Sequence, residues 1–79
     1  MGKDYEIEFI CWMECYKGKK WTVYDWNNNK RKILNREEFF KEYNLDIENL
    51  NITNLYISPS EKVIILSMKY NTYIISILD

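Results

Sequence analysis

Turn-forming residues recur along the 79-residue chain and divide it into short segments rich in apolar side chains. These breaks fall at Gly18, at the three asparagines of residues 27–29, at Asn44, at Pro59 and at Asn71. Glycine and asparagine tolerate the left-handed backbone that tight turns need, and proline fixes one turn angle. The spacing therefore predicts a chain that doubles back repeatedly, as antiparallel strands do.

The composition also favours strands over helices. Hydrophobic residues make up 47% of the chain and aromatic residues 16%, which excludes a disordered chain. Isoleucine, leucine and tyrosine dominate, and alanine, the strongest helix former, is missing. A chain of this length forms one small core with marginal stability, so we expect residues 1–79 to be a single domain.

Residues 5–16 alternate between two sets of side chains, as a half-buried strand does. We therefore predict a strand here, a turn at residues 17–20 and a second strand over residues 21–26, together forming a hairpin. The core side of the first strand carries Phe9, Cys11 and Met13. The outer side of the hairpin carries an aromatic group: Trp12, Tyr16 and, from the second strand, Trp21.

One helix is marked by local signals. Asn35 stands at an N-cap position with Glu38 three residues later, as in a capping box. The predicted helix covers residues 36–43 and ends at Asn44. Further strands are predicted over residues 30–34, 52–57, 63–70 and 73–78. The expected fold class is α+β: an antiparallel sheet of about five to six strands with one short α-helix (β-β-β-α-β-β-β), curled or half-closed to bury both faces.

The chain has few of the residue patterns that enzymes use. The chain has no histidine, which removes the commonest general base and metal ligand. Its two glycines cannot form a phosphate loop, and no motif supports Glu14 and Asp25 as a catalytic carboxylate pair. On a strand, Cys11 and Cys15 would lie about 13 Å apart, too far for a disulfide, and two thiols are too few for zinc. We therefore predict no enzyme, no catalytic residue, no metal and no cofactor, with both cysteines reduced and packed as small apolar side chains.

The N-terminal residues are charged rather than apolar, which argues against a secretion signal. The longest apolar stretches are far shorter than the roughly 20 residues that span a membrane. We therefore expect a cytoplasmic protein with no membrane contact.

Charge is unevenly distributed, although the net charge is only −1. Cations concentrate in residues 17–36, and carboxylates in the segments on either side. Such patches steer a complementary partner, and aromatic rings that one short helix cannot cover would supply the contact area. We therefore predict a partner-binding patch of Trp12, Tyr16, Lys17, Lys19, Lys20 and Trp21. The competing interpretation buries these rings in the core of a curled sheet.

These features predict a small, non-catalytic binding protein that inhibits a larger protein. The expected type is an anti-defence (anti-CRISPR-like) or immunity-type inhibitor of a phage or mobile element; the Lys-, Asn- and Ile-rich composition agrees with the AT-rich genome of such a source. A homodimer joined through the sheet is one alternative. The other is a nucleic-acid-binding module that uses the Lys/Arg and Trp/Tyr cluster of residues 17–32, with Lys30, Arg31 and Lys32 on phosphates. An isoelectric point near 5.4 is low for that role.

Overall fold

The computed structural model describes residues 4–78, with the element order α-β-β-α-β-β-β. Helix α1 covers Tyr5–Cys15 and helix α2 covers Arg36–Glu42. The strands are β1 (Lys20–Asp25), β2 (Lys30–Leu34), β3 (Ile52–Ile57), β4 (Val63–Met68) and β5 (Thr72–Leu78). The predicted α+β class with an antiparallel sheet is confirmed, but a second helix takes the place of the first predicted strand.

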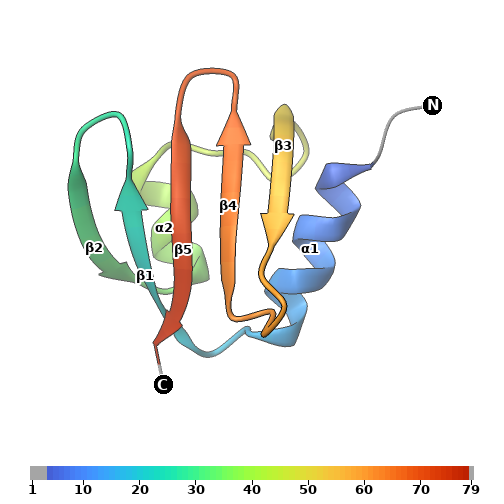
Figure 1. Cartoon of the computed structure of the whole chain (residues 1–79). Coiled ribbons are helices and arrows are strands. Elements are labelled where there is room, and N and C mark those ends of the chain that lie inside the picture. Colours follow the sequence, from blue (N-terminus) through green and yellow to red (C-terminus); the bar gives the residue numbers. More distant parts are fainter. Residues whose placement is uncertain (1–3, 79) are drawn as a thin grey trace.

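The sheet has five strands in the order β2-β1-β5-β4-β3, and every neighbouring pair is antiparallel (Figure 1). The hairpins β1–β2 and β3–β4 lie on either side of β5, which is the central strand. The edge strands β2 and β3 do not pair with each other, so the sheet is open. The prediction of a half-closed sheet is therefore wrong.

The predicted strand over residues 5–16 is wrong because this segment forms α1. The sequence fits both periods: Tyr5, Phe9 and Met13 recur at helical spacing as well as on alternate positions. The carboxylate of Asp4 caps the helix by accepting a hydrogen bond from the amide of Ile7 at 3.2 Å. The helix buries Phe9, Trp12 and Met13 on one side, whereas Ile7, Cys11 and Cys15 are exposed on the other.

The signals that predicted α2 are confirmed. The side chain of Asn35 accepts a hydrogen bond from the amide of Glu38 at 2.8 Å. The Glu38 carboxylate accepts one from the amide of Asn35, also at 2.8 Å, which lowers the pKa of Glu38. The helix ends one residue earlier than predicted, and Asn44 beyond it has the expected left-handed backbone, with φ of 54°. Both termini of α2 therefore follow from local sequence.

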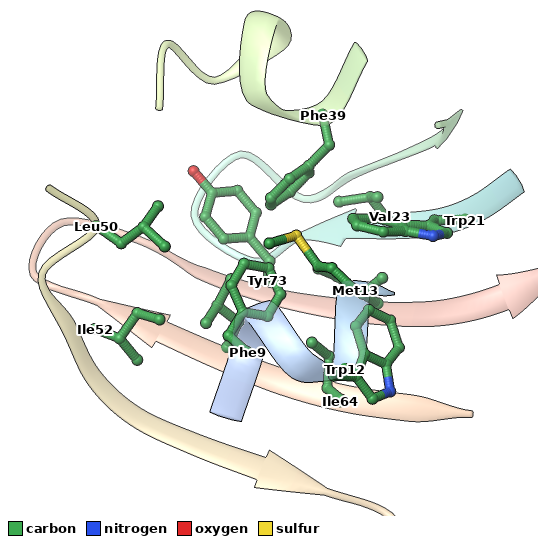
Figure 2. Packing of buried hydrophobic residues seen from close by; sticks show 12 residues of the cluster. Phe9, Trp12, Met13, Trp21, Val23, Phe39, Leu50, Ile52, Ile64 and Tyr73 are labelled. Atoms are coloured by element: carbon green, nitrogen blue, oxygen red, sulfur yellow. The ribbon is translucent and has the colours of Figure 1, made fainter. Parts of the chain in front are cut away.

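Both helices pack on the same face of the sheet. Phe9 and Met13 from α1 and Phe39 from α2 meet the buried side chains of the strands (Figure 2). The ring of Trp21 links the two helices, with its centroid 5.4 Å from that of Trp12 and 5.7 Å from that of Phe39. The core therefore lies wholly between one face of the sheet and the two helices. Within residues 4–78, neither helix is long and apolar enough to cross a membrane.

Candidate binding surface

The face of the sheet that points away from both helices has no covering element among residues 4–78, and we call it the open face (Figure 1). Because side chains alternate along a strand, its members are the strand residues between the buried ones. They are Lys20, Thr22 and Tyr24 on β1, Arg31 and Ile33 on β2, Asn54 and Tyr56 on β3, Val63, Ile65 and Ser67 on β4, and Thr72, Ile74, Ser76 and Leu78 on β5.

A row of four large side chains crosses the middle of the open face. Tyr24 is paired with Ile74, Ile74 with Ile65, and Ile65 with Tyr56, so the row spans β1, β5, β4 and β3. Tyr56 is 52% exposed and Ile65 is 37% exposed. We call these four residues the open-face row. A contiguous apolar surface of this kind is typical of binding sites, whereas single exposed apolar residues are not informative.

The open-face row continues toward β2 through contacts with Tyr24. The ring of Trp26, which is 60% exposed, meets that of Tyr24 edge to face, with centroids 5.9 Å apart. The guanidinium of Arg31 lies over the Tyr24 ring, 6.0 Å from its centroid. The Tyr24 hydroxyl donates to the side chain of Asn29 in the β1–β2 turn. Tyrosine, tryptophan and arginine are the side chains that dominate binding hot spots.

Charge on the two sides of the sheet differs in sign. Asp25 is the only carboxylate in the five strands, and it lies on the helix side, 3% exposed. Among the described residues the open face carries the cation Arg31 and no carboxylate, since the ammonium of Lys20 at the start of β1 lies 3.7 Å from Glu38 of α2. The two helices, by contrast, carry the acidic residues Glu6, Glu8, Glu14, Glu37, Glu38 and Glu42. The open face is therefore apolar, with Arg31 as a cation at its β2 edge.

The tryptophans of the predicted binding patch lie in the core. Trp12 is 5% exposed and Trp21 is fully buried, while Tyr16 is half-buried with its ring centroid 5.3 Å from that of Trp12. Their predicted outer position is wrong because residues 5–16 are helical and the hairpin that set the register does not exist. The competing interpretation, that these rings belong to the core, describes their burial correctly.

The lysines of that patch and the β2 cations lie apart. Lys17, Lys19 and Lys20 are exposed at the α1–β1 connection, where Lys17 is 3.7 Å from Glu14 and Lys20 is 3.7 Å from Glu38. Lys30, Arg31 and Lys32 alternate in direction along β2. Arg31 faces the open face, whereas Lys32 forms an ion pair with Glu42 of α2 on the helix side. The structure therefore does not bring the basic residues of 17–32 into one cluster.

Sequence reasoning did not assign the open-face row to a site. The signal was present, because the last two strands are apolar at consecutive positions and so on both faces. It was masked by the expectation that the aromatic residues of the first segment occupied the outer surface.

Both cysteines are free and exposed on α1. The predicted packing as small apolar side chains is therefore wrong, and so is the strand geometry that placed them about 13 Å apart. Residues four positions apart on a helix lie on one face, about 5–6 Å apart between Cβ atoms. Among residues 4–78 there is no group of three or more His, Cys, Asp or Glu side chains that could hold a metal ion.

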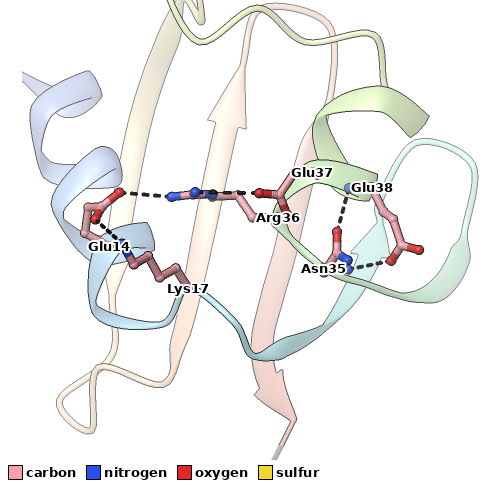
Figure 3. A network of polar contacts seen from close by, with 6 residues as sticks. All are labelled: Glu14, Lys17, Asn35, Arg36, Glu37 and Glu38. Atoms are coloured by element: carbon pink, nitrogen blue, oxygen red, sulfur yellow. Dashed lines mark hydrogen bonds and ion pairs between the residues drawn. The ribbon is translucent and has the colours of Figure 1, made fainter.

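Arg36 joins α1 to α2 (Figure 3). Its guanidinium donates to Glu14 of α1 at 3.0 Å and lies 3.6 Å from the carboxylate of Glu37. The hydrogen bond from Arg36, together with Lys17, holds the pKa of Glu14 below its usual value. A cleft of about 680 Å³ with apolar walls formed by Ile10, Met13 and Phe40 lies between the helices beside this pair. The network ties α1 to α2, and within it the Glu14 carboxylate is the ion-pair partner of Arg36.

Asp25, which was considered with Glu14 as a catalytic pair, holds two turns together. It accepts hydrogen bonds from the side chains of Asn28 and Asn71, each at 2.8 Å, and so ties the β1–β2 turn to the β4–β5 turn. Burial raises the pKa of Asp25, but these hydrogen bonds outweigh burial and the net pKa is lowered. Glu14 and Asp25 lie on different elements with different partners, so they form no catalytic pair.

No family model, curated protein or solved structure matches the chain. The candidate site therefore rests on the geometry of the open face alone.

Proposed function

We propose that this is a non-catalytic binding protein that docks onto a larger protein through its open face. The observation that carries the proposal is the open-face row, which runs across four strands on a face with no cover within residues 4–78. Both helices bury their apolar sides on the opposite face, so the fold leaves this surface to a partner. The described residues supply no nucleophile–base pair that would favour catalysis.

Charge defines the chemistry of the partner. A surface with an apolar centre and carboxylates around it would match the open-face row and Arg31. A second copy of the chain is a poorer match, because two open faces would bring cations together without any carboxylate. We infer that the protein binds its target at a fixed ratio. It would inhibit the target by covering a surface that the target needs for its own activity.

The test compares two double variants, each of which replaces two exposed large apolar side chains. Tyr56→Thr with Ile65→Thr changes the open-face row, and threonine keeps the strand propensity. Ile7→Thr with Ile47→Thr is the matched control, because Ile7 is 57% and Ile47 is 45% exposed, and both lie off the sheet. Each protein is immobilised and used to capture partners from a lysate of the source cells, and the captured protein is then purified and titrated.

The proposal expects a purified partner that binds at fixed stoichiometry, with affinity about 30-fold lower for the open-face variant and unchanged for the control. Equal binding to both variants would overturn it. Sedimentation equilibrium showing that the open face joins two copies would also overturn it. Tight, salt-dependent binding to a mixed oligonucleotide that the open-face variant loses would also overturn the proposal, because that outcome supports a nucleic-acid-binding module.

A further inference from the structure

The two edges of the sheet are protected to different degrees. α1 lies along β3, and the carboxylate of Glu6 accepts a hydrogen bond from the amide of Ile52 at 3.0 Å (Figure 1). A register shift between Ile52 and Asn54 also interrupts the β3 ladder. Bulges and covering elements are the means by which proteins prevent other strands from pairing with an edge. The β3 edge is therefore blocked.

Among the described residues the β2 edge has no bulge and no covering element, and its cationic side chains protect it against other basic strands only. Its register with β1 is continuous from Lys30 to Leu34, and no strand or helix of residues 4–78 lies beyond it (Figure 1). An edge strand of this kind presents alternate main-chain donors and acceptors to an added strand. Its outer side borders the open face through Arg31 and Ile33, which is 58% exposed.

The side chains of β2 restrict which strand can be added. The strand carries Lys30, Arg31 and Lys32 and no carboxylate. Among residues 4–78, only Lys32 of these three forms an ion pair. Two β2 strands paired parallel would place all three cations opposite their copies, and paired antiparallel over residues 30–34 they would place Lys32 opposite Lys32. Like charges in these positions disfavour a second copy of the chain. An acidic extended segment meets no such repulsion.

We propose that β2 binds an extended acidic segment of the partner as a sixth strand of the sheet. This inference rests on the proposed function, because the segment belongs to the protein that covers the open face. Side chains opposite Lys30, Arg31 and Lys32 are acidic, and those opposite Ile33 and Leu34 are apolar. The segment therefore has three acidic residues followed by two apolar ones if it runs parallel to β2, and the reverse order if it runs antiparallel.

Two fluorescein-labelled peptides provide the probes: Ser-Glu-Glu-Glu-Val-Val-Ser for the parallel orientation and Ser-Val-Val-Glu-Glu-Glu-Ser for the antiparallel one. Each is also made in two forms, with backbone N-methyl groups on odd or on even positions. Only one alternate set of amides can pair with β2, because successive amides in a strand point in opposite directions. Binding is measured by fluorescence polarisation at two salt concentrations.

We expect one orientation to bind, with affinity falling at least 10-fold when one alternate set of amides is methylated and little when the other set is. The variant Lys30→Glu with Arg31→Glu should lower binding by a similar factor, whereas the charge-matched control Lys19→Glu with Lys69→Glu should not. Equal binding of all methylated forms would show attraction by charge alone and overturn strand addition. Absence of binding by either peptide at millimolar concentration would overturn it too.

The outcomes of the two experiments are separable. If the open-face variant loses its purified partner while neither peptide binds β2, strand addition is wrong and docking on the open face stands. If a peptide adds to β2 and the open-face variant keeps full affinity for the partner, docking through the open-face row is wrong.

Discussion

Replacing Trp12 by alanine is expected to destabilise the fold by about 3–5 kcal/mol, the usual cost of removing a large buried aromatic side chain. Trp12 is 5% exposed, and the centroid of its ring lies 5.4 Å from that of Trp21 and 6.3 Å from that of Phe9. Its indole N–H donates to the carbonyl of Glu61 at 2.7 Å, which fastens α1 to the β3–β4 turn. Trp12→Phe keeps much of the packing and loses this bond, so it should cost about 1–2 kcal/mol.

Urea unfolding, followed by circular dichroism, measures these losses. A domain of this length has roughly 4–12 kcal/mol of stability in total, so Trp12→Ala should remove a large part of it. Trp26→Ala is the control, because Trp26 is 60% exposed, and it should change stability by no more than about 0.5 kcal/mol. Equal stabilities of Trp12→Ala and Trp26→Ala would refute the helical placement of Trp12 in the core.

Three further measurements test local features. Asn35→Ala should lower stability by about 0.5–2 kcal/mol through loss of the N-cap, as read by the urea midpoint. The lowered pKa of Asp25 gives stability that is present above about pH 4 and lost as the pH falls toward its folded pKa, so the stability gap between wild type and Asp25→Asn should narrow below pH 4. Burial, together with the nearby acidic groups of Asp25, Tyr73 and Glu42, raises the pKa of Tyr43 to about 12. The unfolded chain ionises this phenol from about pH 10, before the folded protein does, so the stability of the fold should fall as the pH rises from about 10 toward 12. Absorbance at alkaline pH should show a late phenolate step that Tyr43→Phe reduces but does not abolish, because burial also raises the pKa of Tyr73.

The elements with local signals were predictable. Asn35 and Glu38 define the start of α2 without help from the rest of the fold, and Asn44 marks its end. The five other predicted strands were found within two residues of their limits, because turn residues bound them and apolar and polar side chains alternate along them. In these segments local preference and tertiary packing agree.

The segment over residues 5–16 shows where the pattern was insufficient. Exposed Ile7 and Cys11 on the outer side of α1 filled the positions that a clean helical pattern leaves polar. The apparent alternation arose because buried and exposed apolar residues of α1 together occupy every second position. Asp4 as an N-cap, followed by Glu6 and Glu8 in the first turn, was the signal that favoured a helix. An uninterrupted stretch of this length is also long for a strand.

The open-face row was not predicted as a site because of the same error. With a strand at residues 5–16, one helix seemed too little to cover the sheet and the aromatic residues of the first segment were assigned to its outside. With two helices on one face of the sheet, that face is covered and the opposite face has no covering element among residues 4–78. Which of the alternating strand residues lie on the open face depends on the face against which the helices pack, and that packing is a property of the whole fold.

The central position of β5 has a consequence for how the chain folds. β1 and β5 are direct neighbours although about fifty residues separate them in the sequence, and each hairpin reaches the other only through β5. During synthesis, β1–β2 and β3–β4 would leave the ribosome as two separate ribbons that are too small to be stable alone. The five-stranded sheet can assemble only when residues 72–78 have emerged, because β5 joins the two hairpins. Native structure should therefore form in a single step, on the slower timescale of folds rich in long-range contacts.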